Sequence, residues 1–284
     1  MVPSVAVSVI VPCYKVEDYV RPCIESILDQ QFDHPFEVIA IDDGSPDRTG
    51  AILDSIAQDD FRLRVVHQDN RGLSGARNTG IASARGEALV FVDSDDMLCE
   101  GALQSLYDEW QRSSCDFVTA SYEEMSEDGK RPSPIVGTRS HGAPWARLYD
   151  REVWRGLEFP EGCWFEDTVQ AFCIDRRFSE SYLDKSVYLY RSNNEGITAR
   201  CVSSKKGLDS FWVTEAMLDW ADSLGLAYDQ GMHDRLVYQL GPILYARCRA
   251  LDGKEMRALF ALACQLYARH GFGLSCSWGG VGGA

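Results

Sequence analysis

The chain has 284 residues and a formal net charge of −15, with 43 acidic side chains against 28 basic ones. Hydrophobic residues make up 45% of the chain and charged residues 25%, which is ordinary for a globular protein that buries a sizeable core. Proteins that bind duplex nucleic acid normally carry the opposite charge, so we expect no nucleic-acid partner. A phosphorylated ligand would need a local positive group, for which a divalent metal is the simplest candidate.

Cysteine usage and the N-terminal sequence indicate a reducing compartment. The ten cysteines form no C-x-x-C pair, and several lie in apolar runs, as small buried side chains do. Residues 1–11 lack the basic start and the long apolar stretch of a signal peptide, and no stretch approaches the ~18 apolar residues that span a bilayer. We therefore expect a cytoplasmic protein, and a peripheral position at the inner face of the membrane stays compatible with this.

Apolar runs and helical patterns alternate over the first hundred residues. Short runs rich in β-branched side chains predict strands at 5–11, 36–41, 63–66 and 88–92. Pro12 is expected to end the first of them. Amphipathic spacing predicts helices at 20–28, 47–57 and 73–85. This alternation predicts an α/β fold with a mostly parallel central sheet flanked by helices, whose ligands bind beyond the carboxyl ends of the strands.

The pattern changes after residue 100. A helix at 101–112 and a strand at 116–121 precede a polar stretch with Gly and Pro at 123–143, which predicts a surface loop. A further strand is expected at 181–190. Residues 205–270 have helical spacing and predict a helical C-terminal region, with core candidates Trp212, Leu218, Leu240, Ile243, Leu244 and Leu262.

Asp93, Ser94 and Asp95 follow the fourth predicted strand. Carboxylates two positions apart converge on one cation where a chain turns sharply, and hard divalent ions keep coordination positions open for phosphate oxygens. An isolated pair of this kind is more often a solvated turn. Its place at the end of an apolar strand in an α/β pattern favours a metal site.

The turn at 42–45 reads Asp-Asp-Gly-Ser. An aspartate at a strand end can accept a hydrogen bond from a base or a ribose, and glycine permits close approach of a ligand. An ordinary strand-to-helix turn with an N-cap explains the same residues about equally well.

Glu166 and Asp167 stand between two aromatic residues and an apolar helical stretch. A carboxylate half-shielded by rings can have a raised pKa and act as a general base. Taken alone, however, these residues favour an acidic helix start, which the helix macrodipole stabilises.

The segment 72–78, Gly-Leu-Ser-Gly-Ala-Arg-Asn, opens a predicted helix. Backbone N–H groups there suit an anion, and Arg77 could reach a diphosphate. Alternatively, the small residues Gly75, Ala76 and Gly80 allow close packing of the helix on the sheet. The chain lacks the glycine patterns of dinucleotide-binding and P-loop proteins, so neither a dehydrogenase nor a P-loop NTPase is expected.

Taken together and in this order, the motifs resemble the family 2 glycosyltransferases with the GT-A fold. The resemblance covers about residues 5–200 and rests on residues 7–14, 26–32, 41–45, 72–78, 91–96, 144–149, 159–162 and 166–168. It implies an inverting transfer of a sugar, by a single displacement, from a UDP-type donor to an acceptor hydroxyl in the synthesis of a cell-surface polysaccharide or glycolipid.

The resemblance also implies which residues bind the donor. Pro12, Tyr14 and Asp43 would line the nucleotide pocket, with Asp43 accepting a hydrogen bond from the uracil ring, and Arg77 would contact the donor. The asparagine that usually follows the tyrosine is Lys15 in this chain.

For the metal and the chemistry, the resemblance implies a second group of residues. Asp95 would be the principal ligand of Mn²⁺ or Mg²⁺, and Asp93 would hold the ribose or the metal. Asp167 would be the catalytic base, with Glu166 beside it. The family often has a histidine in the loop that matches residues 190–198, and this chain has none there, so no third metal ligand is assigned.

On this interpretation the chain has a GT-A domain and an extension. Residues 1–200 form the GT-A domain, of which 1–121 bind the nucleotide sugar and 122–200 the acceptor, and 201–284 form a helical C-terminal extension. The expected partners are a nucleotide-sugar donor and a saccharide or lipid-linked saccharide acceptor.

Two other functions stay open at this point. A nucleotidyltransferase should have a basic, glycine-rich loop after the first strand, where residues 12–15 read Pro-Cys-Tyr-Lys instead. A non-catalytic carbohydrate-binding protein would have no need of Asp95 and Asp167.

Overall fold

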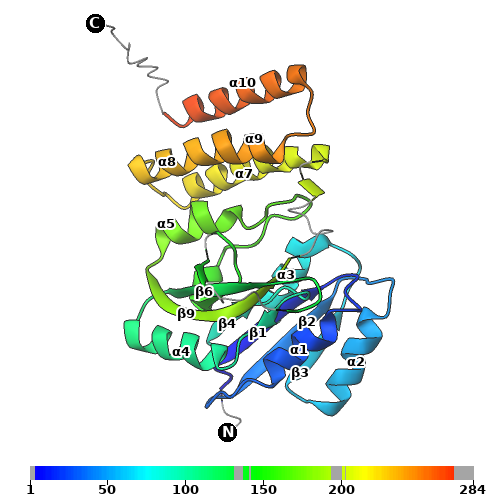
Figure 1. Ribbon diagram of the computed structural model, residues 1–284. Coiled ribbons are helices and arrows are strands. Elements are labelled where there is room, and N and C mark those ends of the chain that lie inside the picture. The colour runs from blue at the N-terminus through cyan, green and yellow to red at the C-terminus, as the bar shows by residue number, and fades with distance from the viewer. Residues whose placement is uncertain (1–3, 131–136, 141, 193–199, 202, 272–284) are drawn as a thin grey trace, which may run out of the picture. The chain divides into compact units, whose positions relative to one another are not determined.

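The structure is a computed structural model that describes residues 4–130, 137–140, 142–192, 200–201 and 203–271. The chain separates into two compact units, Met1–Gly196 and Ile197–Ala284. Within the described residues every strand belongs to the first unit, and the second unit is helical (Figure 1). The predicted α/β class with a helical C-terminal region is confirmed. None of the described helices has both the length and the apolar character that crossing a membrane requires.

A nine-stranded sheet forms the centre of the first unit, in the order β3-β2-β1-β4-β8-β6-β9-β5, with β7 paired to β6. Its strands are β1 Val7–Cys13, β2 Phe36–Asp42, β3 Leu63–His67, β4 Ala88–Phe91, β5 Met97–Leu98, β6 Phe117–Met125, β7 Thr138–Arg139, β8 Arg147–Asp150 and β9 Glu180–Arg191. Strands β1 to β4 are parallel, as predicted.

The other half of the sheet is mixed. Strand β8 runs antiparallel to β4 and β6, while β6 and β9 are parallel. The antiparallel strands β5, β7 and β8 were not predicted from the sequence. Each has only two to four residues, which is too short to show an alternating pattern.

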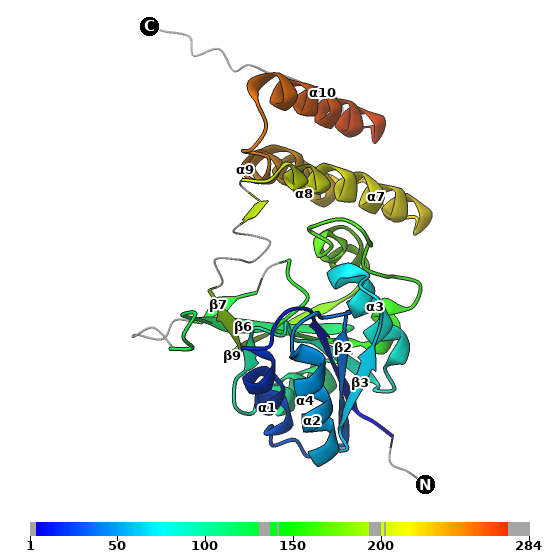
Figure 2. The same cartoon turned by 90° about the vertical axis from the view of Figure 1, so that its right-hand side faces the viewer.

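Helices cover both faces of the sheet (Figures 1 and 2). They are α1 Val20–Leu28, α2 Thr49–Asp59, α3 Gly72–Ser83 and α4 Ala102–Ser113. Val9 and Val11 of β1 share a hydrophobic cluster with α1, α2 and α4. Ile10 faces α3 instead, where a Cβ added to Gly80 would lie 2.3 Å from the Ile10 Cγ2 atom. The close packing that the small residues of 72–80 allow is confirmed at Gly80.

Pro12 does not end the first strand, contrary to the prediction, because β1 continues through it to Cys13. The hydrogen bonds of β1 alternate between its two neighbours. The carbonyl of Ile10 accepts from the N–H of Val92 on the β4 side, and that of Cys13 accepts from the N–H of Asp43 on the β2 side. The nitrogen of Pro12 faces the β4 side and has no hydrogen to donate there, and the pairing of β1 with β4 ends at Ile10 and Phe91, whereas the pairing with β2 continues to Cys13 and Asp42.

The surface loop predicted at 123–143 is wrong at both ends. Strand β6 extends to Met125, and β7 pairs with Ser121 and Tyr122. Glu123 and Met125 are buried and Glu124 between them is exposed, so the strand alternates although two of these residues are acidic. Residues 131–136 and 141 lie outside the described residues.

The second unit consists of α7 Asp209–Ser223, α8 Gln230–Tyr238, α9 Leu244–Arg247 and α10 Gly253–Arg269, with a π-helical turn Gln239–Ile243 between α8 and α9. Leu218, Leu240 and Leu244 are buried as predicted, and Ile243 is half-buried. Trp212 and Leu262 are 53% and 42% exposed, so their prediction as core residues is wrong. These helices carry apolar side chains on more faces than the core covers, and spacing alone cannot tell which face is inside.

Candidate active site at the edge of the sheet

The chain turns sharply after β4, where the N–H of Asp96 donates to the carbonyl of Asp93 at 3.0 Å. Asp93 and Asp95 are half-buried, and Asp96 is buried. The carboxylate of Asp96 accepts from the Tyr188 hydroxyl and from the backbone N–H of Arg191, both at 2.7 Å. Asp96 therefore fastens the turn to β9, a role that sequence analysis did not assign.

Negative charge gathers at this turn. Burial, followed by the charges of Asp95 and Asp93, raises the pKa of Asp96 well above its usual range. Burial and the same three carboxylates raise the pKa of Tyr190 to about 12. A bound cation would relieve this repulsion.

The donor atoms at this turn fit a metal that is shared with a ligand. Mg²⁺ and similar ions are commonly held by one or two carboxylates together with substrate phosphates, and Asp93 and Asp95 offer such a pair. No group of three or more Asp, Glu, His or Cys side chains that could hold a metal occurs among the described residues. The arrangement therefore suits a metal bound together with a diphosphate better than a metal held by the protein alone.

Arg77 of α3 joins this turn to a distant segment. Its side chain is 2% exposed, and its Nη2 donates to Asp93 Oδ1 at 2.6 Å while its Nη1 donates to Glu166 Oε1 at 2.5 Å. The guanidinium lies over the ring of Phe159, 5.2 Å from the ring centre. The two carboxylates raise the pKa of Arg77 despite its burial. Arg77 therefore acts as a buried bridge, and the predicted contact with the donor stays a prediction.

Glu166 and Asp167 occupy different environments although they are adjacent. Glu166 is buried and paired with Arg77, whereas Asp167 is half-buried. Both lie in the turn that opens the π-helical segment Gln170–Ile174 and α5 Asp175–Arg177, so the acidic helix start also matches. Phe165, just before them, is buried with φ +67°, a conformation that is strained for a bulky residue. Backbone strain of this kind is commonest at functional sites, where it fixes the direction of a side chain.

Asn78 holds the same segment from the next position of α3. Its amide nitrogen donates to the carbonyl of Phe159 at 2.9 Å, and its amide oxygen accepts from the Phe159 N–H at 2.8 Å. Arg71, just before α3, forms an ion pair of 2.5 Å with Glu161. Three side chains from one short stretch thus fix residues 159–166. Only Arg77 among them was singled out from the sequence.

Asp43 supports the other end of α3. Its buried carboxylate accepts from the backbone N–H groups of Arg71 and Gly72, each at 2.8 Å, and from the amide of Gln68 at 2.6 Å. A carboxylate has about four acceptor positions, so three protein donors leave room for one more. The structure gives Asp43 a role in ordering the start of α3, and its contact with a base stays a prediction.

The remaining predicted donor residues lie at the end of β1. Pro12 is buried, and Tyr14 is 44% exposed. Lys15 has φ +56°, the left-handed region that asparagine adopts more readily than lysine, and its N–H donates to the Ser45 hydroxyl at 3.3 Å. The conformation explains why an asparagine is usual at this position.

Helix α3 connects three of these segments. Asp43 binds its first turn, Arg77 binds Asp93 and Glu166, and Asn78 binds Phe159. Such an arrangement can place a metal-bound anion on one side of the Arg77 guanidinium and a proton acceptor on the other.

A family model described as "Glycosyl transferase family 2" matches residues 8–161. The chain belongs to glycosyl transferase family 2. It is 36% identical over 224 residues to the uncharacterized glycosyltransferase EpsJ of Bacillus subtilis, an alignment that covers 70% of this chain and 64% of EpsJ. The family predicted from the motifs is confirmed, and the chain spans about two thirds of the length of this relative.

Solved structures share the fold. S. aureus TarS in complex with UDP-GlcNAc has a TM-score of 0.60 and 21% identity, over 93% of this chain and 87% of TarS. The mannosyltransferase PcManGT from Pyrobaculum calidifontis, in complex with GDP-Man and Mn²⁺, has a TM-score of 0.57 and 20% identity, over 95% of this chain and 76% of PcManGT. The predicted GT-A fold of this glycosyl transferase family 2 member is confirmed.

Proposed function

We propose that this chain is an inverting glycosyltransferase that moves a sugar from a nucleotide-diphosphate donor, a UDP-sugar, to an acceptor hydroxyl, with Mn²⁺ or Mg²⁺. The observation that carries the proposal is the bridge of Arg77 between Asp93 and Glu166. Through this bridge one guanidinium links Asp93, which we assign to the donor side, to Glu166, which precedes the proposed base Asp167.

On the donor side, Asp95 and Asp93 hold the metal and Tyr14 offers an exposed ring beside the nucleotide. When bound, the metal would stabilise the charge that grows on the leaving diphosphate. Asp96, Tyr188 and Arg191 keep the turn in place, because the Arg191 Nε also donates to the Asp95 carbonyl at 2.6 Å. These contacts fix the backbone of the turn that carries Asp95, so Asp95 can bind a metal without rearrangement of the turn.

On the acceptor side, Asp167 is the base. Glu166 is buried and paired with Arg77, whereas Asp167 is half-buried, so Asp167 is the carboxylate that we assign as the proton acceptor. The acceptor oxygen forms its bond to the anomeric carbon as the bond to the diphosphate breaks, and the acceptor proton passes to the Asp167 carboxylate. One displacement of this kind inverts the anomeric centre.

The nucleotide and the acceptor belong to the proposal as well. A UDP-sugar follows from the resemblance and is supported by the UDP-GlcNAc in TarS, while the GDP-Man in PcManGT makes a GDP-sugar the second candidate. The acceptor class is a saccharide or a lipid-linked saccharide of a cell-surface polymer. A cytoplasmic location suits both substrates.

A thermal-shift titration with UDP-, GDP- and dTDP-sugars tests donor binding. A ligand that binds only the folded state raises the Tm. We expect a UDP-sugar to do so only when Mn²⁺ or Mg²⁺ is present, because the proposed site binds the diphosphate through the metal. Release of UDP in the presence of saccharide acceptors then measures transfer. The proposal is rejected if no nucleotide sugar raises the Tm with metal present, or if pyrophosphate is released from a nucleoside triphosphate instead.

A further inference from the structure

Charge is distributed unevenly between the two units. Residues 1–196 contain 35 acidic and 19 basic side chains, whereas residues 197–284 contain eight acidic and nine basic ones. Within 235–271, six basic side chains stand against two acidic ones. The negative charge of the chain therefore belongs to the first unit, and the last helices are basic. Such asymmetry is typical of a protein that meets an acidic partner with one part of its surface.

The same helices expose apolar side chains. Nine large hydrophobic residues are exposed among those described, and six of them belong to the second unit: Trp212, Val237, Tyr238, Tyr245, Phe260 and Leu262. Helix α10 buries Leu259, Ala263 and Leu266 and leaves Phe260 and Leu262 exposed. Clusters of exposed apolar side chains mark sites of contact with a partner or a membrane.

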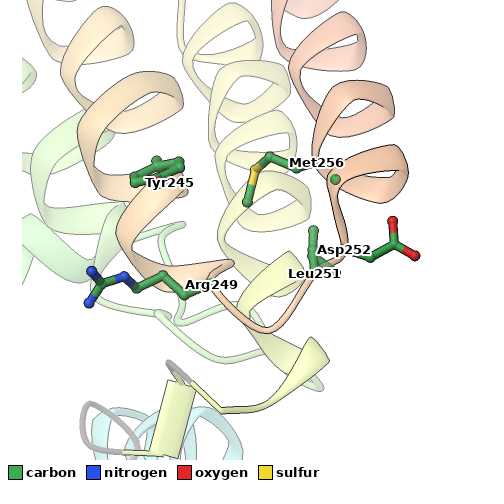
Figure 3. A pocket seen from close by; sticks show the side chains of 6 residues that line it. Tyr245, Arg249, Leu251, Asp252 and Met256 are labelled. Carbon is green, nitrogen blue, oxygen red and sulfur yellow. The ribbon is translucent and has the colours of Figure 1, made fainter.

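A hollow lies between the end of α9 and the start of α10. It has a volume of about 280 Å³ and is lined by Tyr245, Arg249, Leu251, Asp252, Gly253 and Met256. In Figure 3 Met256 points from α10 into the space that Tyr245 and Arg249 border from the other side. All of its lining residues belong to the second unit, and none of them is a predicted active-site residue.

Five exposed side chains and the half-buried Met256 surround the hollow. On α10, Lys254 and Arg257 are three positions apart, as are Arg257 and Phe260, and Met256 and Phe260 are four apart, so each is a neighbour of the next on the helix surface. We name this the basic aromatic surface, and its members are Tyr245, Arg249, Lys254, Met256, Arg257 and Phe260.

The two acidic side chains next to this surface are already engaged. Asp252 caps α10, accepting from the N–H groups of Lys254 and Glu255 at 2.7 and 2.8 Å, and these bonds lower its pKa. Glu255 pairs with Lys205, which lowers the pKa of Glu255. Among the described residues no ion pair forms on Arg249, Lys254 or Arg257. The net charge that the surface presents is therefore positive.

We propose that the basic aromatic surface docks the protein on an anionic phospholipid bilayer. Tyrosine and phenylalanine favour the membrane interface, and arginine and lysine are attracted to anionic headgroups. The acidic first unit would be repelled by the same headgroups, so the helical unit is the part that makes contact. A symmetric contact with a second copy would place like charges opposite each other, which makes the bilayer the better partner.

Sedimentation of the full chain with vesicles tests this proposal, and it needs no nucleotide sugar, so its outcome is independent of the proposed transfer. The probes are vesicles of phosphatidylcholine alone and vesicles in which about a third of the lipid is phosphatidylglycerol, at ~0.1 M salt. We expect binding to the anionic vesicles only. Removing three charges by Arg249→Gln, Lys254→Gln and Arg257→Gln should weaken binding roughly 100-fold, at about fivefold for each charge.

The matched control removes three exposed arginines from the first unit, with Arg21→Gln, Arg151→Gln and Arg155→Gln. Binding by this variant should equal that of the unaltered protein. Tyr245→Ser with Phe260→Ser should weaken binding without changing its dependence on anionic lipid, and circular dichroism checks that the variants fold. The proposal is overturned if both lipids bind equally, if the control loses as much as the test variant, or if the protein self-associates through this surface and leaves the vesicles unbound.

Discussion

Arg77 and Glu166 form a buried ion pair, with the Nη1 and Oε1 atoms 2.5 Å apart, across 89 positions of the chain. Because the same guanidinium also binds Asp93, the pair couples the turn after β4 to the turn that presents Asp167. The two halves of the proposed reaction therefore depend on one buried side chain.

Replacing Arg77 should destabilise the fold strongly. Arg77→Met leaves Glu166 buried without its cation, and breaking one partner of a buried pair costs about 3–5 kcal/mol. Urea denaturation measures this loss, and the double variant Arg77→Met with Glu166→Gln should recover part of it. Arg112→Lys, which keeps the positive charge beside Glu109 at an exposed position, should leave the free energy of unfolding nearly unchanged. A loss no larger than that of the Arg112 variant would contradict the bridging role.

Asp167→Asn should abolish transfer while sparing the donor. An asparagine cannot take the acceptor proton, so kcat should fall by roughly 10²–10⁴-fold. The thermal shift with UDP-sugar and metal should stay at its original size. Glu166→Gln keeps an oxygen that can accept from Arg77, so its kcat should fall much less. If both variants retain full kcat, neither residue is the base.

Asp95→Asn should remove the metal requirement together with donor affinity. The variant loses the charge that attracts the cation, so Mn²⁺ should no longer increase the Tm shift given by the UDP-sugar. Asp59→Asn changes an exposed carboxylate at the last position of α2 and is the matched control. A metal-dependent shift that survives in Asp95→Asn would exclude this residue as a ligand.

Lys15→Asn should stabilise the protein. Lysine at φ +56° is strained, and asparagine adopts this region more readily, so the gain should be roughly 0.5–1 kcal/mol. Urea denaturation measures it. Lys15→Ala removes the same side chain but keeps the strain, and should give no gain. An equal gain from alanine would assign the effect to the side chain rather than to the backbone.

His67 should make stability depend on pH. Hydrogen bonds from its ring to Asp42 and then Asp54 raise its pKa above the usual value. The stabilisation is therefore complete below the unfolded-state pKa of about 6.5 and is lost as the pH rises through the folded-state pKa. Since the side chain is 49% exposed, the effect should stay below about 1 kcal/mol.

The comparison for His67 is with His67→Gln. Its free energy of unfolding should differ from that of the unaltered protein more at about pH 5.5 than at about pH 8.5. A difference that does not change with pH would mean that His67 contributes nothing through its charge.

The strongly periodic parts of the fold were predictable from the sequence. Strands β1 to β4 follow from apolar runs rich in β-branched side chains, and helix α1 follows from amphipathic spacing. Strand β5 has only two residues and β8 is polar at both ends, so neither forms such a run. Pro12 misled the prediction because it ends the pairing of β1 with β4 but not the pairing with β2.

The site was predictable as a set of motifs but not as a set of contacts. Asp93 and Asp167 stand out by their place after a strand and beside aromatic residues. Asp96 does not, because its partner Tyr188 lies 92 positions away and nothing local marks it. Asn78 reads as an ordinary helix residue until Phe159 is placed beside it. The spacing of residues in the sequence predicts helices and strands, whereas contacts between residues far apart in the chain become visible only in the folded structure.

The contact between Gly80 and Ile10 sets the height at which α3 lies above the sheet. Even one added methyl group there would push the helix outward, and Arg77 and Asn78 would travel with it. The geometry of the proposed active site thus depends on a buried glycine on the side of α3 that faces the sheet. A substitution of Gly80 would therefore change the rate of the proposed reaction without replacing any residue of the proposed site.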